Sequence, residues 1–484
     1  MGDVFKDRLD SSLSGITNQM REQVGENLYN RGVYNSMLIA EAIRTAQKIT
    51  GKKAVNGEDV RRGFEALNIT DARYLTALKL FLQAISPGEY AAHKGFARIG
   101  REFEGVGTQV ACQMQSLDEI RHAQTQIHAI SNYNKYYDGF HAFAQQRDRM
   151  WYNTVPRSFF DDAMAGGPFE FITAIGFAFE YVLTNLLFVP FMSGAAYNGD
   201  MATVTFGFSA QSDEARHMTL GLECIKFMLE QDPDNLPIVQ KWLDKWFWRG
   251  LRILTLVGAM MDYMLPKRVM SWKEAWQIYG VENGSALFRD LARYGVRVPK
   301  GWDEACESAD HVSHQLMLGL YQWSFGTAFH AWIPSDEDME WLSAKYPDTF
   351  DRYYRPRWDH IRKMEAAGTP YANVGLAQVC NVCQLPCVFT EPGDPTTHCH
   401  RQEELEGETY HFCSDGCREI FLEEPEKYVQ SWLPMPQLFA APNFGDVGKW
   451  MDWVGLVPGQ DNGDYSQSRD KASFEAWKRQ TSAA

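Results

Sequence analysis

Two copies of one five-residue pattern constrain this chain more than any other feature of its sequence. Asp-Glu-x-Arg-His occurs at residues 118–122 and again at residues 213–217. In an α-helix, residues three positions apart lie on the same face, so Glu119 points the same way as His122, and Glu214 the same way as His217. Two such helices facing each other would present two carboxylates and two imidazoles. The repeated pattern therefore predicts a site for a pair of metal ions.

Two isolated glutamates complete this prediction. Glu180 is almost the only charge in the apolar stretch 169–192, where a buried carboxylate needs a metal or a partner. Glu89 follows the apolar run 80–85 and a turn predicted at residues 86–88. Glu89 lies 30 residues before Glu119, and Glu180 lies 34 residues before Glu214. The similar offsets predict two helix pairs, each supplying Glu and then Glu-x-x-His, as in ferritin-like di-iron proteins. Mixed carboxylate and imidazole ligation favours iron or manganese, and iron activates dioxygen.

The residues beside the ligands have a functional and a plain interpretation. Asp118 and Asp213 are each predicted to accept the free ring N–H of a ligand histidine, and Arg121 and Arg216 to balance those carboxylates. The two aspartates are also compatible with surface acids, and a single Glu-x-x-His is usually an exposed pair. The second copy of the motif is what favours the metal site.

Long helical periodicity predicts an all-α body over residues 70 to about 335. The stretch 169–192 is long enough to span a membrane, but a carboxylate near its middle favours a buried core helix. The N-terminus has no apolar signal region, which predicts a cytoplasmic protein. The net charge of −15 argues against a nucleic-acid partner.

Six of the nine cysteines lie between Cys380 and Cys417, which indicates a metal site in a reducing compartment. Cys380-x2-Cys383 and Cys413-x3-Cys417 have the spacing of a four-thiolate structural zinc site. Such a closed site has no open position, so we assign it a role in stability or docking. Competing ligands are Cys387, His398, Cys399, His400 and His411.

The residues from Phe179 through Glu180 and Thr184 to Asn185, together with the run from Gln211 to His217, resemble the large subunit of bacterial multicomponent phenol hydroxylases. That family belongs with the toluene and methane monooxygenases, and the resemblance extends from about Thr70 to about residue 435. It implies that two irons are held by six ligands: Glu89, Glu119, His122, Glu180, Glu214 and His217.

The resemblance also implies roles for residues near the irons. Thr184 matches a threonine implicated in oxygen activation or proton delivery, although a helical threonine often just bonds the carbonyl four residues earlier. Asn185 and Gln211 match positions near a gating pore. Simple core packing would equally explain the residues that match the aromatic substrate pocket: Ile85, Phe159, Phe179 and Phe188.

The activity implied by the resemblance is that of an NADH-dependent phenol 2-monooxygenase, which converts phenol or methylphenols to catechols with O2. Electrons would come from NADH through a separate reductase carrying FAD and a [2Fe–2S] cluster, and no Gly-rich dinucleotide fingerprint is found here. The implied partners are two smaller hydroxylase subunits, a coupling protein and the reductase. Alternatives are a toluene or benzene monooxygenase of the same family, a ferritin-type iron store and a ribonucleotide reductase small subunit.

The first part of the chain departs from this family. Residues 26–67 resemble a stretch of periplasmic branched-chain amino-acid binding proteins, which suggests a fusion and, as a further alternative, a non-enzymatic solute-binding component. The predicted organisation is an atypical N-terminal segment (1–69), a ferritin-like di-iron domain (70–370), a Cys-rich zinc module (371–433) and a C-terminal extension (434–484).

Overall fold

The computed structural model describes residues 27–65, 72–134, 151–268, 270–322, 333–367, 378–387 and 400–431. The chain divides into two compact units: Met1–Thr70 with Gly199–Met201, and the remainder. The predicted C-terminal extension, residues 434–484, lies outside the described residues. The three boundaries between the four predicted segments stay predictions.

In the first unit, the helices α3 (Asn27–Thr50) and α4 (Gly57–Glu65) pack against each other. The helix α4 begins with a reciprocal cap, in which the Asp59 N–H donates to Asn56 Oδ1 over 2.9 Å and the Asn56 N–H donates to Asp59 Oδ2 over 3.2 Å. Gly63 permits the close approach of the two helices, because a Cβ there would lie 2.1 Å from the Ala42 carbonyl oxygen.

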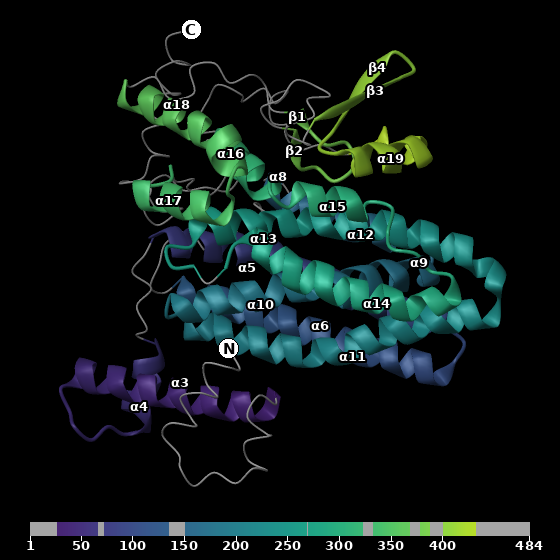
Figure 1. The fold of residues 1–484 in the computed structure, drawn as a ribbon. Helices are drawn as coiled ribbons and strands as arrows, with labels where there is room; N and C mark the ends of the chain where they lie inside the picture. The colour runs from purple at the N-terminus through teal and green to yellow at the C-terminus, as the bar shows by residue number, and fades with distance from the viewer. Residues whose placement is uncertain are drawn as a thin grey trace, which may run out of the picture. The chain divides into compact units, whose positions relative to one another are not determined.

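The second unit is built on long helices (Figure 1). These are α5 (Ala72–Glu102), α6 (Val106–Tyr133), the π-helix η1 (Thr173–Tyr181) continuing into α10 (Val182–Tyr197), α11 (Met201–Gln231) and α12 (Leu236–Ala259). Helix α5 packs along α6, and α12 packs along η1 and α10. Buried aromatic and aliphatic side chains fill the space between them. The predicted all-α body is confirmed.

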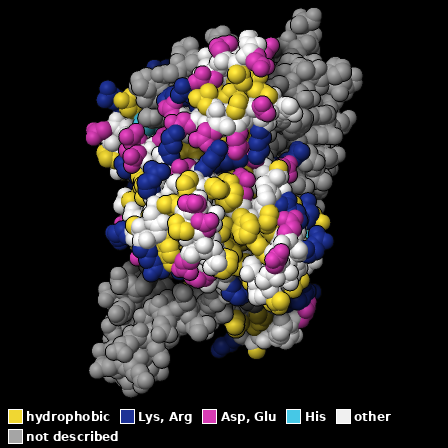
Figure 2. Space-filling view, turned by 90° about the vertical axis from the view of Figure 1, so that its right-hand side faces the viewer, with side chains coloured by type: hydrophobic (Ala, Val, Ile, Leu, Met, Phe, Trp, Pro, Cys, Tyr) yellow, Lys and Arg dark blue, Asp and Glu magenta, His cyan; other side chains and the backbone are white. Residues whose placement is uncertain are grey.

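Shorter helices surround these long ones. They are α8 (Trp151–Ala165), α9 (Pro168–Ile172), η2 (Pro233–Asn235), η3 (Met260–Met264), α13 (Trp272–Ala275), η4 (Trp276–Glu282), α14 (Asn283–Leu291), η5 (Ala292–Tyr294), α15 (Trp302–Ser308), α16 (Val312–Gln322), α17 (Asp336–Lys345), η7 (Phe350–Tyr354) and α18 (Arg355–Ala366). On the face shown in Figure 2, the acidic and basic side chains of the described residues are interspersed, not separated by sign.

The turn predicted before Glu89 is wrong, because α5 continues through Pro87 without interruption. Proline removes one helical N–H and usually breaks a helix. Here tertiary packing keeps the helix continuous: Gly88 lies directly against the Phe160 ring, and the Ser86 hydroxyl adds a bond to the Leu82 carbonyl over 2.8 Å. Glu89 therefore lies in the middle of a long helix and not at the start of one.

The apolar stretch that carries Glu180 is buried in the core. Pro168–Tyr197 is the one helix among the described residues that is long and apolar enough to cross a membrane, and 83% of its most apolar window is buried inside the protein. This burial supports the interpretation as a core helix. Nine residues in its first half, η1, form a π-helix, a local widening that often accompanies functional sites.

The Cys-rich region forms a small module of short elements. The strand β1 (Gln378–Val379) pairs antiparallel with β2 (Pro386–Cys387), and β3 (Arg401–Leu405) pairs antiparallel with β4 (Glu408–Phe412). The helices α19 (Asp415–Glu423) and α20 (Pro425–Tyr428) follow, and α19 contacts α12. The module is thus attached to one of the long helices of the body.

Candidate metal centre

The two Glu-x-x-His motifs face each other from α6 and α11. His217 Nδ1 lies 3.4 Å from Glu214 of its own helix and 3.2 Å from Glu119 of the other helix. His122 Nδ1 lies 3.6 Å from Glu119 and 4.0 Å from Glu214. The four residues are no more than 3% exposed. The i,i+3 spacing has therefore placed both pairs at one buried point.

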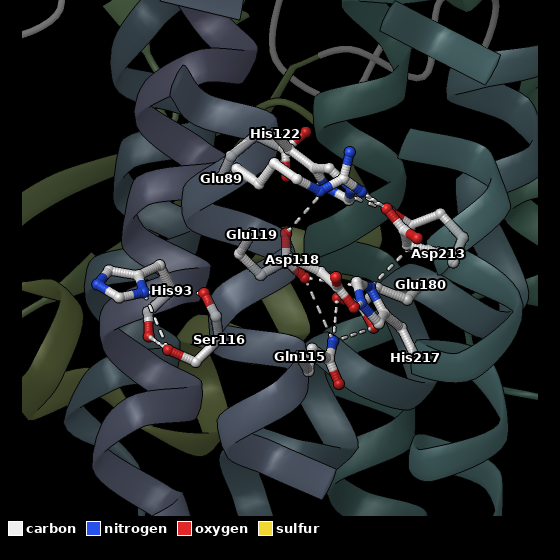
Figure 3. Close-up of polar contacts among 12 residues, drawn as sticks. Glu89, His93, Gln115, Ser116, Asp118, Glu119, His122, Glu180, Asp213 and His217 are labelled. Carbon is white, nitrogen blue, oxygen red and sulfur yellow. Dashed lines mark hydrogen bonds and ion pairs between the residues drawn. The ribbon is translucent and has the colours of Figure 1, made fainter. Parts of the chain in front are cut away.

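The two isolated glutamates reach the same point from two other helices. Glu89 of α5 lies 3.7 Å from His122 Nδ1, and Glu180 comes from η1 (Figure 3). The ligand atoms of Glu89, Glu119 and His122 lie within 4.8 Å of one another, as do those of Glu119, Glu180 and His217. The two groups share Glu119, so the cluster has places for two ions side by side. All six predicted ligands come together.

The unpaired polar atoms of the cluster fit bound cations. Among the described residues, the Nδ1 atoms of His122 and His217 and one oxygen of Glu214 are buried without a hydrogen-bond partner. Burial raises the pKa of Glu119 to about 7. Burial alone would lower the pKa of His217, but the surrounding carboxylates, Glu214 first, raise it to about 11. Four buried carboxylates thus demand positive charge, which protons supply in the absence of metal and which iron ions would supply at the same atoms.

The aspartate of each motif holds the histidine of the other motif. His122 Nε2 lies 3.0 Å from Asp213 Oδ2, and His217 Nε2 lies 3.3 Å from Asp118 Oδ2. Donation of the Nε2 proton to these carboxylates leaves Nδ1 free to bind a metal. Arg216 donates to Asp118 over 2.8 Å and to Asp213 over 2.6 Å, and Arg121 pairs with Asp213. Each aspartate thus bonds the histidine of the other helix, and the spacing within one motif could not predict this pairing between α6 and α11.

A small apolar cavity, about 60 Å³, adjoins the carboxylates. Of the residues predicted to line it, Ile85, Phe179 and Phe188 do so, and Thr184, predicted to act beside the irons, lines it as well. Phe159 does not; it packs on its neighbour Phe160 and on Trp246, and Phe160 lines the cavity instead. Asn185 and Gln211 are half-buried and are not among the lining residues. A one-residue error of this kind arises because consecutive helical residues differ by about 100° in direction.

The four predicted zinc ligands also come together. The sulfurs of Cys380, Cys383, Cys413 and Cys417 lie within 4.8 Å of one another, and all four residues are buried. The Cys417 N–H donates to Ser414 Oγ, which caps α19 and orients the second knuckle. The competing ligands are placed differently: Cys387 is buried outside the group, while His400 and His411 pair with each other over 2.9 Å. His398 and Cys399 lie outside the described residues.

Known proteins resemble this chain over most of its length. A model of the methane/phenol/alkene hydroxylase family matches residues 46–232, and a YHS domain model matches residues 390–432. The oxygenase component DmpN of phenol 2-monooxygenase from Pseudomonas sp. (strain CF600) is 59% identical over 86% of this chain and 80% of its own length. The chain belongs to this hydroxylase family. The alpha subunit of the alkene monooxygenase oxygenase component from Xanthobacter autotrophicus is 31% identical over 73% of each chain.

A solved structure agrees with this assignment. The hydroxylase matches the xenon-pressurised crystal structure of phenol hydroxylase from Pseudomonas sp. OX1 with a TM-score of 0.80 and 55% sequence identity. The match covers 93% of this chain and 88% of that one. The ferritin-like fold and the assignment as a large oxygenase subunit are therefore confirmed, and an iron store, a ribonucleotide reductase subunit and a solute-binding component are excluded.

The N-terminal resemblance to periplasmic binding proteins is not borne out. The match of the hydroxylase to its family model begins at residue 46, inside the stretch 26–67 that carried that resemblance. Short amphipathic helices of similar composition occur in many folds, so such a stretch is weak evidence of origin.

Sequence reasoning missed several residues of the hydroxylase site. Gln115 and Gln126 of α6 donate to the carboxylates of Glu180 and Glu89. They stand four residues before Glu119 and four residues after His122, so their helical spacing alone would have placed them beside the ligands. Met260 and three residues of α12 also line the cavity: Ile253, Leu256 and Val257. Nothing in their local sequence distinguishes these apolar residues from ordinary core.

Proposed function

We propose that this hydroxylase uses two irons and O2 to convert phenol, or a methylphenol, to a catechol. The observation that carries the proposal is the pair of Glu/His groups that share Glu119 beside an apolar cavity. The choice of phenol rests on the relatives named for that substrate, at 59% and 55% identity, against 31% for an alkene monooxygenase. A toluene or benzene monooxygenase activity is the alternative within the family.

The six clustered side chains would hold the two irons: Glu89, Glu119, His122, Glu180, Glu214 and His217. When bound, the irons supply the activation of O2 and the insertion of one oxygen atom into the ring. The protein contributes what surrounds them. Asp118 and Asp213 keep each imidazole in the tautomer that leaves Nδ1 free, and Arg121 and Arg216 balance those aspartates.

The cavity would orient the substrate and exclude water. Phe179, Phe188 and Phe160 give it aromatic walls that suit a flat ring, and Ile85 adds an aliphatic contact. Among the residues that line the cavity, Thr184 is the one with a hydroxyl group, and we assign to its Oγ1 a role in proton transfer. Asn185 and Gln211 would act outside the cavity, near a pore.

The Cys-rich module would hold one zinc ion through Cys380, Cys383, Cys413 and Cys417. Because four thiolates close the coordination sphere, the ion would support the module and not react. Electrons would reach the irons from NADH through a separate reductase with FAD and a [2Fe–2S] cluster. The working complex would include two smaller subunits and a coupling protein, and would reside in the cytoplasm, where thiols stay reduced.

Purification of the chain with its companion subunits tests this proposal. We expect about two irons and one zinc per chain, and NADH and O2 consumption that depends on phenol and is matched by catechol formation. Toluene and benzene in place of phenol test the alternative. A protein without iron, or a Glu180→Ala variant with unchanged turnover, would refute the proposed function.

A further inference from the structure

One face of α6 carries an amide on each side of the Glu119 and His122 pair. Gln115, Glu119, His122 and Gln126 stand at positions i, i+4, i+7 and i+11 and are each 1–2% exposed. The helix α11 has no such amides: Ala210 and Gly221 occupy the equivalent positions four residues before Glu214 and four residues after His217. The two halves of the motif pair therefore have different surroundings.

The amide of Gln115 is directed at the carboxylate of Glu180. Its Nε2 lies 2.9 Å from Glu180 Oε1, 2.8 Å from Glu180 Oε2 and 3.3 Å from Glu119 Oε1 (Figure 3). Its Oε1 is buried without a hydrogen-bond partner among the described residues. An amide that leaves its own oxygen unpaired is oriented by its donor side, so the two carboxylates determine how Gln115 is held.

Among the described residues, Glu180 lacks the close histidine that the other three glutamates have: Glu89 and Glu119 lie 3.7 Å and 3.6 Å from His122 Nδ1, and Glu214 lies 3.4 Å from His217 Nδ1. Glu180 projects from the π-helix η1 into surroundings formed by Phe179, Thr184 and Phe188. Gln115 is the side chain that donates to it within the described part of the chain. A carboxylate with a single donor would rotate freely about its last torsion if that donor were removed.

We propose that Gln115 is a positioning residue of the iron centre, which acts by fixing the orientation of the Glu180 carboxylate. This inference rests on the proposed function and deepens it. Gln115 supports the half-site of Glu180 and His217 through both oxygens of Glu180. Gln126 supports the half-site of Glu89 and His122 through a single hydrogen bond of 2.9 Å to Glu89. The two half-sites of the iron centre therefore differ in the hydrogen bonds that hold their carboxylates, although the two Asp-Glu-x-Arg-His motifs are alike.

The test compares Gln115→Leu with Gln113→Leu in the complex with its companion subunits. Gln113 is exposed on the opposite face of α6, where it donates to the Ala97 carbonyl, so it controls for a change of residue type on this helix. Cobalt(II) titration followed by visible absorption measures each half-site. We expect Gln115→Leu to weaken one of the two binding steps by roughly 10-fold or more and to change its spectrum, and Gln113→Leu to leave both steps as in the wild type.

Folding is checked on the metal-free protein by circular dichroism and thermal unfolding. Leucine removes the unpaired Gln115 oxygen together with the donor to Glu180, so the midpoint of unfolding shows whether the variant still folds before its cobalt affinity is compared, and Gln115→Met provides a second side chain of similar size without a donor. Equal cobalt affinity and equal spectra for wild type and both Gln115 variants would overturn the inference. That result would leave the proposed function intact, because wild-type iron content and catechol formation test it separately.

Discussion

The two candidate metal sites of this protein differ in what holds their ligands. The Glu/His cluster draws one or two side chains from each of four helices, and its supports cross from one helix to another, as Asp118 does to His217. The Cys cluster draws its ligands from two short knuckles, and backbone groups such as the Cys417 N–H orient them. Oxygen and nitrogen ligands beside a cavity leave room for reactants, whereas four thiolates leave none.

The long helix α12 connects the two sites. Trp248 donates to Ser414 of the second knuckle over 3.1 Å, and Arg249 donates to the Val382 carbonyl of the first knuckle. One to three turns later, Ile253 and Val257 line the cavity beside the Glu/His cluster. The helix that the Cys-rich module contacts therefore also forms one wall of the cavity.

The largest effect is expected from Glu180→Ala. Removal of one carboxylate from the shared cluster should lower catechol formation by more than about 100-fold, since even loss of a residue that only supports a ligand costs roughly 10–100-fold. Iron per chain and product formation measure this effect. Zinc content should stay at about one per chain, and a parallel loss of zinc would show that the two sites are not separate.

Cys417→Ser should remove the zinc ion and leave the iron content unchanged. Loss of one of four thiolates should release the zinc ion and lower the midpoint of thermal unfolding, because structural zinc contributes directly to folding. Metal analysis should still find about two irons. Cys306→Ser provides the control, since Cys306 lies outside both clusters. Equal iron loss in the Cys417 variant would mean that the module is needed to assemble the iron site.

Asp213→Asn tests the support that crosses between the motifs. The amide keeps the shape of Asp213 but removes the charge that accepts the Nε2 proton of His122 and pairs with Arg216. Iron affinity should fall by roughly 10- to 100-fold. Competition with a chelator gives the affinity. Asp234→Asn, on an exposed turn far along the chain, should leave it unchanged.

Arg252→Met tests the charge beneath the thiolates. Arg252 is buried, its Nε and one Nη lack a partner among the described residues, and the thiolates of Cys413 and Cys417 oppose the effect of burial on its pKa. Loss of this cation should weaken zinc binding by about 10-fold, or roughly 1.4 kcal/mol. Zinc release to a chromogenic chelator measures it. Arg293→Met, where the exposed Arg293 stacks on half-buried Tyr294, is the matched control.

The smallest effect concerns Asp262 of η3, which belongs to neither site. Burial raises the pKa of Asp262 to about 6, against the hydrogen bonds from Ser313, Tyr346 and the Trp272 N–H. A raised folded pKa means that the protonated form stabilises the fold and that this contribution is lost as pH rises through about 6. Asp262→Asn should therefore gain stability relative to wild type by about 1 kcal/mol between pH 5 and pH 7. Thermal unfolding of both proteins at the two pH values measures it. A difference that does not change with pH would contradict the assignment.

Much of the site followed from local spacing. The i,i+3 period placed Glu119 with His122 and Glu214 with His217, and isolation in an apolar stretch identified Glu180. The cysteine spacing identified both knuckles. The helical body could also be predicted, because long segments with a helical repeat of apolar residues are compatible with few other structures. The local turn rule failed at Pro87, where packing against Phe160 keeps α5 continuous. The family resemblance did not place Phe159, because a residue's direction around the helix decides what it touches.

The sequence by itself determined which side chains could bind metal and which segments are helical, because both depend on residues close together in the chain. Only the tertiary structure decided how the two Asp-Glu-x-Arg-His motifs exchange their aspartates, which amide supports Glu180, and that α12 joins the Cys cluster to the cavity. These arrangements depend on contacts between residues that are 65 to 166 positions apart in the chain. No local period encodes such contacts, since they form only when long helices pack at particular rotations about their axes.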